Sequence, residues 1–160
     1  MKMNRKNFVR IGALLALVLT AGIAYAAGND AFLGTWKLNE GKSKIAAGMP
    51  KNSTVVNTVD GDNMKVAIDG TDTKGQPYHS EWTGKFDGKD YALTGDPAND
   101  MRSYKVINDH TLSTTSKKGG KETLSARIVV SADGKTRTVT ASGTDASGAK
   151  VTSTQVYDKQ

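Results

Sequence analysis

Hydrophobic and polar residues alternate with a period of two along most of the chain from residue 33 onward. Such alternation places successive side chains on opposite faces of a β-strand, and it differs from the 3.6-residue period of a helix. Gly, Asn, Asp and Ser recur between the alternating segments, as is typical of turns between strands. The pattern predicts ten strands, over residues 33–39, 53–59, 64–69, 77–86, 90–94, 102–107, 111–116, 121–130, 136–142 and 150–158.

The connections between these segments have the composition of tight turns. Asp-Gly followed by Asp-Asn at residues 60–63 adopts positive φ at low cost and predicts a hairpin. Gly-Thr-Asp opens two turns, at residues 70–75 and 143–148, where we expect Asp72 and Asp145 to accept hydrogen bonds from backbone amides. Residues 40–52 break the alternation, and we expect a loop there, with room for one helical turn, covering one end of the sheet.

Consecutive hairpins without crossover helices favour an all-β fold, in which an antiparallel up-and-down meander closes into a barrel of eight to ten strands. Closure buries one face of the meander and removes its exposed edges. A sandwich of two sheets would show a similar pattern and is the second choice. The inward-facing set predicted by the alternation is Trp36, Val66, Trp82, Leu93, Tyr104, Leu112, Ile128 and Val139.

Residues 1–26 have the three parts of a secretory signal peptide. Four basic residues precede an apolar run over residues 11–23, and Ala24-Tyr25-Ala26 supplies the small residues of a cleavage site. A retained membrane anchor is the alternative, but the run is short for a span of about 20 residues. We therefore expect an exported protein, periplasmic or secreted, whose mature part is one barrel domain over residues 27–160.

Cleavage changes what the charge implies. The whole chain has 22 basic and 16 acidic residues, a net charge of +6, but four of the basic residues lie in the signal, which leaves 18 against 16 and a net charge of +2. A nearly neutral domain does not predict nucleic-acid binding. The basic cluster Lys117–Lys121 is most simply a solvated hairpin tip. No apolar run after residue 27 is long enough to span a membrane, so we expect no stable membrane insertion after cleavage.

Candidate chemistry is sparse. The chain has no cysteine, which excludes thiol nucleophiles and disulfides. His79-Ser80-Glu81 contains the residue types of a hydrolase, but alternation places Ser80 on the opposite face from the other two. The acidic turn at residues 60–63 lacks the spaced ligands and the closing Glu of a calcium loop. We predict no catalytic residues, no metal site and no cofactor, and thus a protein that is not an enzyme.

A family resemblance covers most of residues 31–160. Gly34-Thr35-Trp36 on a first strand, followed by an all-hairpin meander, resembles the calycins, which include lipocalins, fatty-acid-binding proteins and avidin-type barrels. The longer run at residues 32–39 with Lys42-Ser43-Lys44 resembles small secreted bacterial lipocalin-like proteins of unassigned role. Further matches to that group are Asp87-Gly88-Lys89-Asp90-Tyr91, Asp133-Gly134-Lys135 and Val156-Tyr157-Asp158-Lys159-Gln160.

The resemblance implies a role for Trp36. In calycins the matching tryptophan closes the barrel floor, and an arginine from a late strand packs on its ring. Residues 151–158 contain no arginine, so Arg127 or Arg137 would have to supply that cation. The C-terminal helix of lipocalins is also missing from the sequence.

Two functions fit a small exported barrel. The first is a carrier that binds a small hydrophobic or amphipathic ligand in the lumen. The second is a non-enzymatic interaction module, such as an inhibitor or envelope assembly factor, which binds an unknown protein partner through its loops and has a filled barrel. The carrier needs an empty lumen above Trp36. The aromatic residues that could either line such a lumen or fill it are Tyr78, Trp82, Phe86, Tyr91 and Tyr104.

Overall fold

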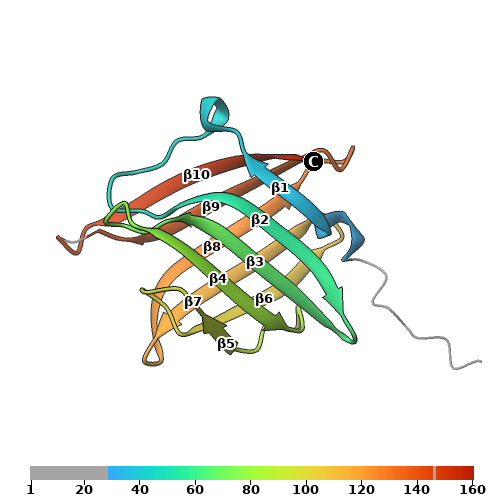
Figure 1. The fold of residues 1–160 in the computed structure, drawn as a ribbon, viewed down its shortest axis with the longest axis horizontal. Coiled ribbons are helices and arrows are strands. Elements are labelled where there is room, and N and C mark those ends of the chain that lie inside the picture. Colours follow the sequence, from blue (N-terminus) through green and yellow to red (C-terminus); the bar gives the residue numbers. More distant parts are fainter. Residues whose placement is uncertain (1–28, 146) are drawn as a thin grey trace, which may run out of the picture.

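The protein is a closed antiparallel barrel of ten strands, each paired with its neighbours in the chain (Figure 1). The computed structural model describes residues 29–145 and 147–160, so the predicted signal peptide at residues 1–26 lies outside the described residues. Two short 3₁₀ helices, η1 (Asp30–Phe32) and η2 (Glu40–Lys42), flank the first strand. The strands are β1 (Gly34–Leu38), β2 (Lys51–Asp60), β3 (Asn63–Thr71), β4 (Pro77–Gly84), β5 (Tyr91–Thr94), β6 (Met101–Asn108), β7 (Thr111–Lys118), β8 (Lys121–Val130), β9 (Thr136–Thr144) and β10 (Lys150–Lys159).

All ten predicted strands are confirmed, and the barrel, not the two-layered sandwich, is the correct architecture. The hairpin at residues 60–63 is also confirmed, with Gly61 and Asp62 in the turn. In the two Gly-Thr-Asp turns, Asp72 accepts hydrogen bonds from the amides of Lys74 and Gln76, and Asp145 does the same for Ala149. The short local motifs therefore determine where the chain reverses direction.

The five-residue strand β1 closes the barrel. Trp36 lies opposite Val55 of β2 on one side and opposite Lys159 of β10 on the other. Gly34 has a φ of +110°, and a Cβ there would come 3.0 Å from Cε of Lys159. The Gly-x-Trp spacing thus leaves room for the lysine, whose Nζ lies 5.1 Å from the centroid of the Trp36 ring.

One end of the barrel is closed by η1. Phe32 and Trp36 have no exposed surface, and the Trp36 indole Nε1 donates a hydrogen bond of 3.0 Å to the carbonyl of Phe32. The same carbonyl accepts a bond of 2.8 Å from Nδ2 of Asn57, on the inner face of β2. Two buried side chains therefore hold the helix across this end, which we call the floor.

Large side chains pack the lumen next to the floor. Of the predicted inward-facing set, Val139 is partly buried against the core and the other members are buried. Trp82 lies at the centre of an aromatic group, with its ring 4.8 Å from Tyr104, 5.7 Å from Tyr91 and 5.9 Å from Phe86. Phe86 in turn contacts Phe32 at 6.4 Å, so the aromatic group is continuous with the floor.

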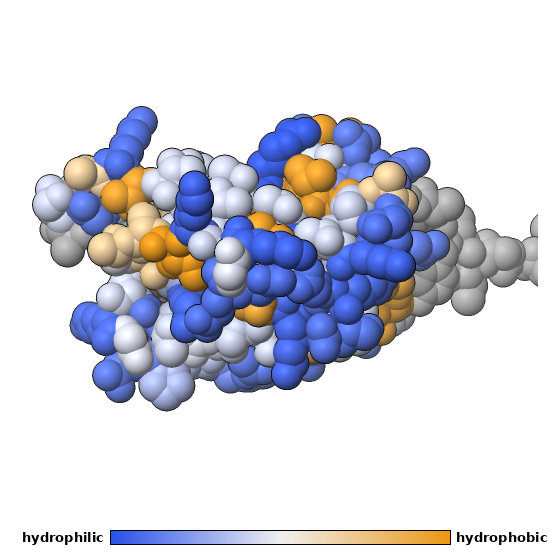
Figure 2. Space-filling model, turned by 90° about the horizontal axis from the view of Figure 1, so that it is seen from above, coloured by the Kyte–Doolittle hydropathy of each residue, from blue (hydrophilic) through white to orange (hydrophobic). Residues whose placement is uncertain are grey.

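The outer surface is largely polar. Figure 2 shows hydrophilic side chains over most of one face, with hydrophobic ones in separate patches. Lys117 and Lys118 lie at a hairpin tip, as predicted, and Lys117 also forms an ion pair of 2.6 Å with Asp90. A helix with the length and apolar character needed to cross a bilayer is not found among the described residues.

Replacing the floor plug tests this packing. We expect Phe32→Ala to lower the free energy of unfolding by about 3–5 kcal/mol, because it removes a fully buried ring and leaves a cavity. The matched control is Ile107→Ala, which truncates a 47% exposed side chain and should change stability by about 0.5 kcal/mol or less. Urea denaturation followed by tryptophan fluorescence measures both. A loss below about 1 kcal/mol for Phe32→Ala would show that η1 does not plug the barrel.

Candidate ligand-binding cavity

The half of the lumen away from the floor contains a cavity of about 360 Å³. Its opening lies among the connections that precede β2, β4, β6, β8 and β10, and we call this end the mouth. The walls combine apolar side chains with hydroxyls and amides. They include Val55, Ile68, Leu124, Ile128, Val139 and Ala141 on the apolar side, and Asn52, Tyr78, Thr114, Ser116, Gln155 and Tyr157 on the polar side.

The five predicted ligand contacts fall into two groups. Tyr78 and Tyr104 line the cavity, and Tyr104 also belongs to the aromatic group around Trp82. Trp82, Phe86 and Tyr91 lie in that group and not on the cavity wall. Tyr91 is held there by a bond of 3.1 Å from its hydroxyl to Asp87. A role of these residues in ligand binding stays a prediction, but the structure gives only two of them a place on the cavity wall.

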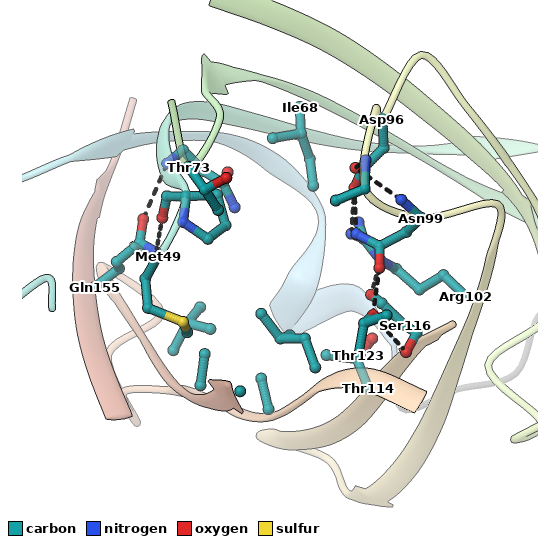
Figure 3. A pocket seen from close by; sticks show the side chains of 18 of the residues that line it. Met49, Ile68, Thr73, Asp96, Asn99, Arg102, Thr114, Ser116, Thr123 and Gln155 are labelled. Carbon is teal, nitrogen blue, oxygen red and sulfur yellow. Dashed lines mark hydrogen bonds and ion pairs between the residues drawn. The ribbon is translucent and has the colours of Figure 1, made fainter. Parts of the chain in front are cut away.

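One side of the mouth is held by an acidic side chain. Oδ2 of Asp96 lies 3.4 Å from Nη2 of Arg102, and Nε of Arg102 donates a bond of 2.9 Å to Ser116. Asp96 also accepts bonds from the amides of its own loop, and Asn99 of that loop bonds to Thr123 of β8. Figure 3 shows these residues together on one side of the cavity. The β5–β6 loop is thereby fixed to β6, β7 and β8.

A second polar network lies across the cavity (Figure 3). Oε1 of Gln155 accepts hydrogen bonds from the backbone N–H of Asn52 at 3.0 Å and from the Tyr157 hydroxyl at 2.9 Å. Nε2 of Gln155 donates a hydrogen bond to the Pro50 carbonyl. The Tyr78 hydroxyl donates a bond of 2.5 Å to Oδ1 of Asn52. Burial raises the pKa of Tyr78 to about 12 and also raises the pKa of Tyr157, so both phenols are neutral at physiological pH.

Arg137 contributes a buried cation to the cavity wall. It lies at the start of β9, directly opposite Tyr157 of β10, and its guanidinium carbon is 5.5 Å from the centroid of that ring. The residue is only 4% exposed, and its Nε and Nη1 atoms have no hydrogen-bond partner. Burial lowers the pKa of Arg137, but a guanidinium stays charged at neutral pH.

The cation over Trp36 differs from the expectation. The resemblance implies Arg127 or Arg137 there, but Lys159 of the last strand occupies that position. Arg127 is exposed on the outside of β8, and Arg137 packs against Tyr157 instead. The physical reason is the strand register, because Trp36 lies directly opposite Lys159 in the β1–β10 pair.

Several residues of the cavity wall do not follow from the alternation of hydrophobic and polar positions. Asn52 points inward because the β2–β3 register shifts between Asn52 and Thr54, and such a bulge is not visible in a simple alternation. Gly70 permits the bulge, since a Cβ there would clash with the Lys51 carbonyl oxygen. Arg137 did have a signal, because it precedes the inward-facing Val139 by two residues.

The His79-Ser80-Glu81 segment does not form a catalytic group. His79 is outside the barrel, with Nδ1 2.7 Å from Asp69 and Nε2 3.6 Å from Glu81, whereas Ser80 is buried inside. The prediction that they lie on opposite faces is confirmed. In the part of the chain that the structure describes, no three His, Asp or Glu side chains are grouped so that they could hold a metal ion.

Comparison with known proteins gives no family. The chain matches no family model and no curated protein. Similar solved structures include EF1p2_mFAP2b bound to DFHBI, at 13% identity and a TM-score of 0.47, covering 86% of this chain and 100% of that one. A redesigned β barrel, mFAP1, bound to DFHBI has 15% identity, a TM-score of 0.43 and coverages of 82% and 98%. A third, the redesigned β barrel b11L5F_LGL, has 12% identity, a TM-score of 0.42 and coverages of 83% and 95%. With TM-scores below 0.5, these similarities indicate nothing about what this chain binds.

The outer carboxylates should control the titration of His79. The hydrogen bond to Asp69 is the largest cause that raises the pKa of His79, and Glu81 adds a smaller effect. We therefore expect Asp69→Asn to lower the His79 pKa, as measured by NMR titration of the imidazole signals. Asp62→Asn, in the exposed β2–β3 turn, is the control and should leave that pKa unchanged. An unaltered pKa in Asp69→Asn would contradict the ion pair.

Proposed function

We propose that this chain is an exported, calycin-like carrier that binds one small hydrophobic or amphipathic molecule inside the barrel without converting it chemically. The observation that supports this proposal is the division of the lumen. The floor half is packed by Phe32, Trp36 and the aromatic group, while the mouth half encloses about 360 Å³. That volume lies near the lower end of the roughly 300–1,000 Å³ found for small-molecule sites.

The wall chemistry supports the same function. Aliphatic side chains such as Ile68 and Ile128 supply the apolar surface that stabilises a ligand by burial. The two polar networks fix Arg102 and Gln155 by hydrogen bonds, so these residues need little reorganisation when a ligand enters. A few oriented polar groups in a mainly apolar wall are typical of small-molecule sites.

The alternative, an interaction module with a filled barrel, is less well supported. It would use the same mouth loops as its binding surface, but it has no need for an internal cavity. The tight fixation of the β5–β6 loop by Asp96 and Asn99 is compatible with either function. The cavity is the observation that favours the carrier over the interaction module.

Filling the cavity provides the test. Ala126 lines the lumen on β8, and Ala126→Phe would place a ring in the empty volume. We expect this variant to bind the neutral fluorescent dye prodan at least about tenfold more weakly than the wild type, since the ring removes the volume that the dye occupies. Its free energy of unfolding should stay within about 1.5 kcal/mol of the wild type, because the ring fills a void.

The matched control is Ala92→Phe. Ala92 is exposed on the outside of β5, so the same substitution adds a ring without entering the lumen. Prodan fluorescence, titrated against each protein, should saturate equally for the wild type and this control. Absence of saturable binding to the wild type, or unchanged binding to Ala126→Phe, would overturn the carrier function.

A further inference from the structure

The outer wall over β6–β10 carries a row of hydroxyl side chains. Side chains alternate between the two faces of each strand, and the sequence neighbours of these residues, such as Tyr104, Thr114 and Ala141, are buried. The strand register places one Ser or Thr of each strand directly opposite one of the next, and the row consists of Ser103, Thr115, Ser125, Ser142 and Thr152. Directly opposed residues of an antiparallel pair have Cβ atoms about 4.5–5.5 Å apart, so the row is continuous from β6 to β10.

A second row lies beside the first, two residues nearer the floor on each strand. It runs from β6 to β10 and continues onto the β1–β2 connection through an isolated bridge. Its members are Lys105, Ser113, Arg127, Thr140, Thr154 and Lys44. We call the two rows together the hydroxyl face. Neither row contains an acidic, aromatic or aliphatic side chain.

Most hydroxyls of this face form no hydrogen bond within the protein. Ser142 and Thr152 lie 3.3 Å apart and share one, but among residues 29–145 and 147–160 the other hydroxyls of the two rows have no partner. A hydroxyl can donate one hydrogen bond and accept two. The face therefore presents donors and acceptors that repeat at the strand spacing of about 4.8 Å.

The cations of the face are also unpaired. Lys44, Lys105 and Arg127 are exposed, and no carboxylate in the described part of the chain forms an ion pair with them. The wall formed by β3 and β4 differs, because its outer Lys65 lies 2.8 Å from Glu81. Positive charge is thus balanced on that wall and left unbalanced on the hydroxyl face.

The nearest carboxylates border the face and have other partners or positions. Asp87 lies opposite Lys105 at the end of the second row, but its ion pair is with Lys89, at 3.7 Å. Asp158 follows the second row on β10 and has an ion pair of 3.5 Å with Lys42. Glu122 lies beyond the first row, at the β7–β8 hairpin. A polyanion on the face would therefore meet hydroxyls and cations along both rows.

The composition of the face indicates the kind of partner. It has no aromatic ring, on which the bases of a single-stranded nucleic acid stack. It also has no large apolar side chain, which the core of a protein interface or a membrane-inserting surface requires. Sugar hydroxyls, like those of Ser and Thr, both donate and accept hydrogen bonds, and acidic sugars carry the negative charge that an unpaired cation attracts.

We propose that the hydroxyl face binds an acidic polysaccharide with carboxylates on its sugar rings. The carboxylates pair with Arg127 and Lys44, which lie three strand spacings apart, or about 14 Å along the sheet. The sugar hydroxyls bond to the Ser and Thr side chains between these two cations. This site is on the outside of the barrel and does not depend on a ligand in the lumen.

The first test compares an acidic polymer with a neutral one. Surface plasmon resonance measures the binding of the wild-type protein to immobilised polygalacturonate and to immobilised dextran. We expect saturable binding to polygalacturonate that weakens with added salt, since exposed charges are screened, and binding to dextran that is weaker by at least about tenfold. Equal binding to the two polymers, or no binding to polygalacturonate, would overturn the inference.

The second test removes the two cations. Lys44→Gln combined with Arg127→Gln should weaken polygalacturonate binding by at least about fivefold, because each exposed ion pair contributes only a few-fold. The matched control combines Lys65→Gln with Lys74→Gln, which removes the same charge from the β3–β4 side and should bind as the wild type does. Equal losses in the two double variants would show attraction to net charge alone and would contradict a site on this face.

The third test removes hydroxyls without changing the charge. Thr140→Val combined with Thr154→Val should weaken polygalacturonate binding by about threefold to tenfold, as is typical when hydrogen bonds are lost. Thr58→Val combined with Thr83→Val, on the outside of β2 and β4, is the control and should leave the affinity unchanged. Unchanged affinity in the Thr140 and Thr154 double variant would remove the hydroxyl rows from the site.

Other polyanions and the lumen provide the remaining comparisons. Vesicles of phosphatidylglycerol and a single-stranded oligonucleotide should bind more weakly than polygalacturonate, and tighter binding of either would overturn the choice of partner. Prodan affinity should be the same in the Lys44 and Arg127 double variant as in the wild type, and Ala126→Phe should bind polygalacturonate normally, so this inference and the carrier function can fail separately. Should a variant not fold, the comparison of polygalacturonate with dextran on the wild type decides.

Discussion

Closure of the sheet through β1 sets the width of the lumen, and the rest of the structure depends on that width. A barrel of about eight strands has an interior that inward side chains can just fill. This barrel has ten strands, so ordinary inward residues leave space unless large rings are supplied. The chain supplies them at one end only, where Phe32, Trp36 and Trp82 pack together, while smaller residues such as Ala126, Thr114 and Ser116 face the lumen at the other.

The two halves of the lumen also differ in the polar groups that they bury. Near the floor, Nδ2 of Asn57 and Nε1 of Trp36 both donate hydrogen bonds to the Phe32 carbonyl, and Oδ1 of Asn57 is a neutral acceptor without a partner. In the open half, Arg137 is buried without an acidic partner. The transfer of an ion from water into a protein interior usually costs several kcal/mol, whereas a desolvated cation–π contact returns about 2 kcal/mol. An unbalanced group of this type is the kind of stability cost that proteins accept at functional sites. The buried cation is therefore consistent with the proposal that a ligand binds in the open half of the lumen.

Much of the fold could be predicted from the sequence, because strand alternation and turn composition are local properties. The inward positions of Trp36, Val66 and Trp82 follow from a period of two, and the turn roles of Asp72 and Asp145 follow from Gly-Thr-Asp. The candidate site could be predicted only in part. The contact of Lys159 with Trp36 depends on register between the first and last strands, and the inward position of Asn52 depends on a bulge. The alternation pattern does not report the width of the barrel. It therefore cannot tell which aromatic residues fill the lumen and which line the cavity.

X-ray diffraction from crystals pressurised with xenon tests the division of the lumen most directly, because xenon enters apolar cavities that side chains leave unfilled. We expect xenon in the mouth half, against Ile68, Ile128 and Val139, and none in the layer of Phe32 and Trp36. Xenon bound in the floor layer, or a mouth half filled by packed side chains with no site, would contradict it.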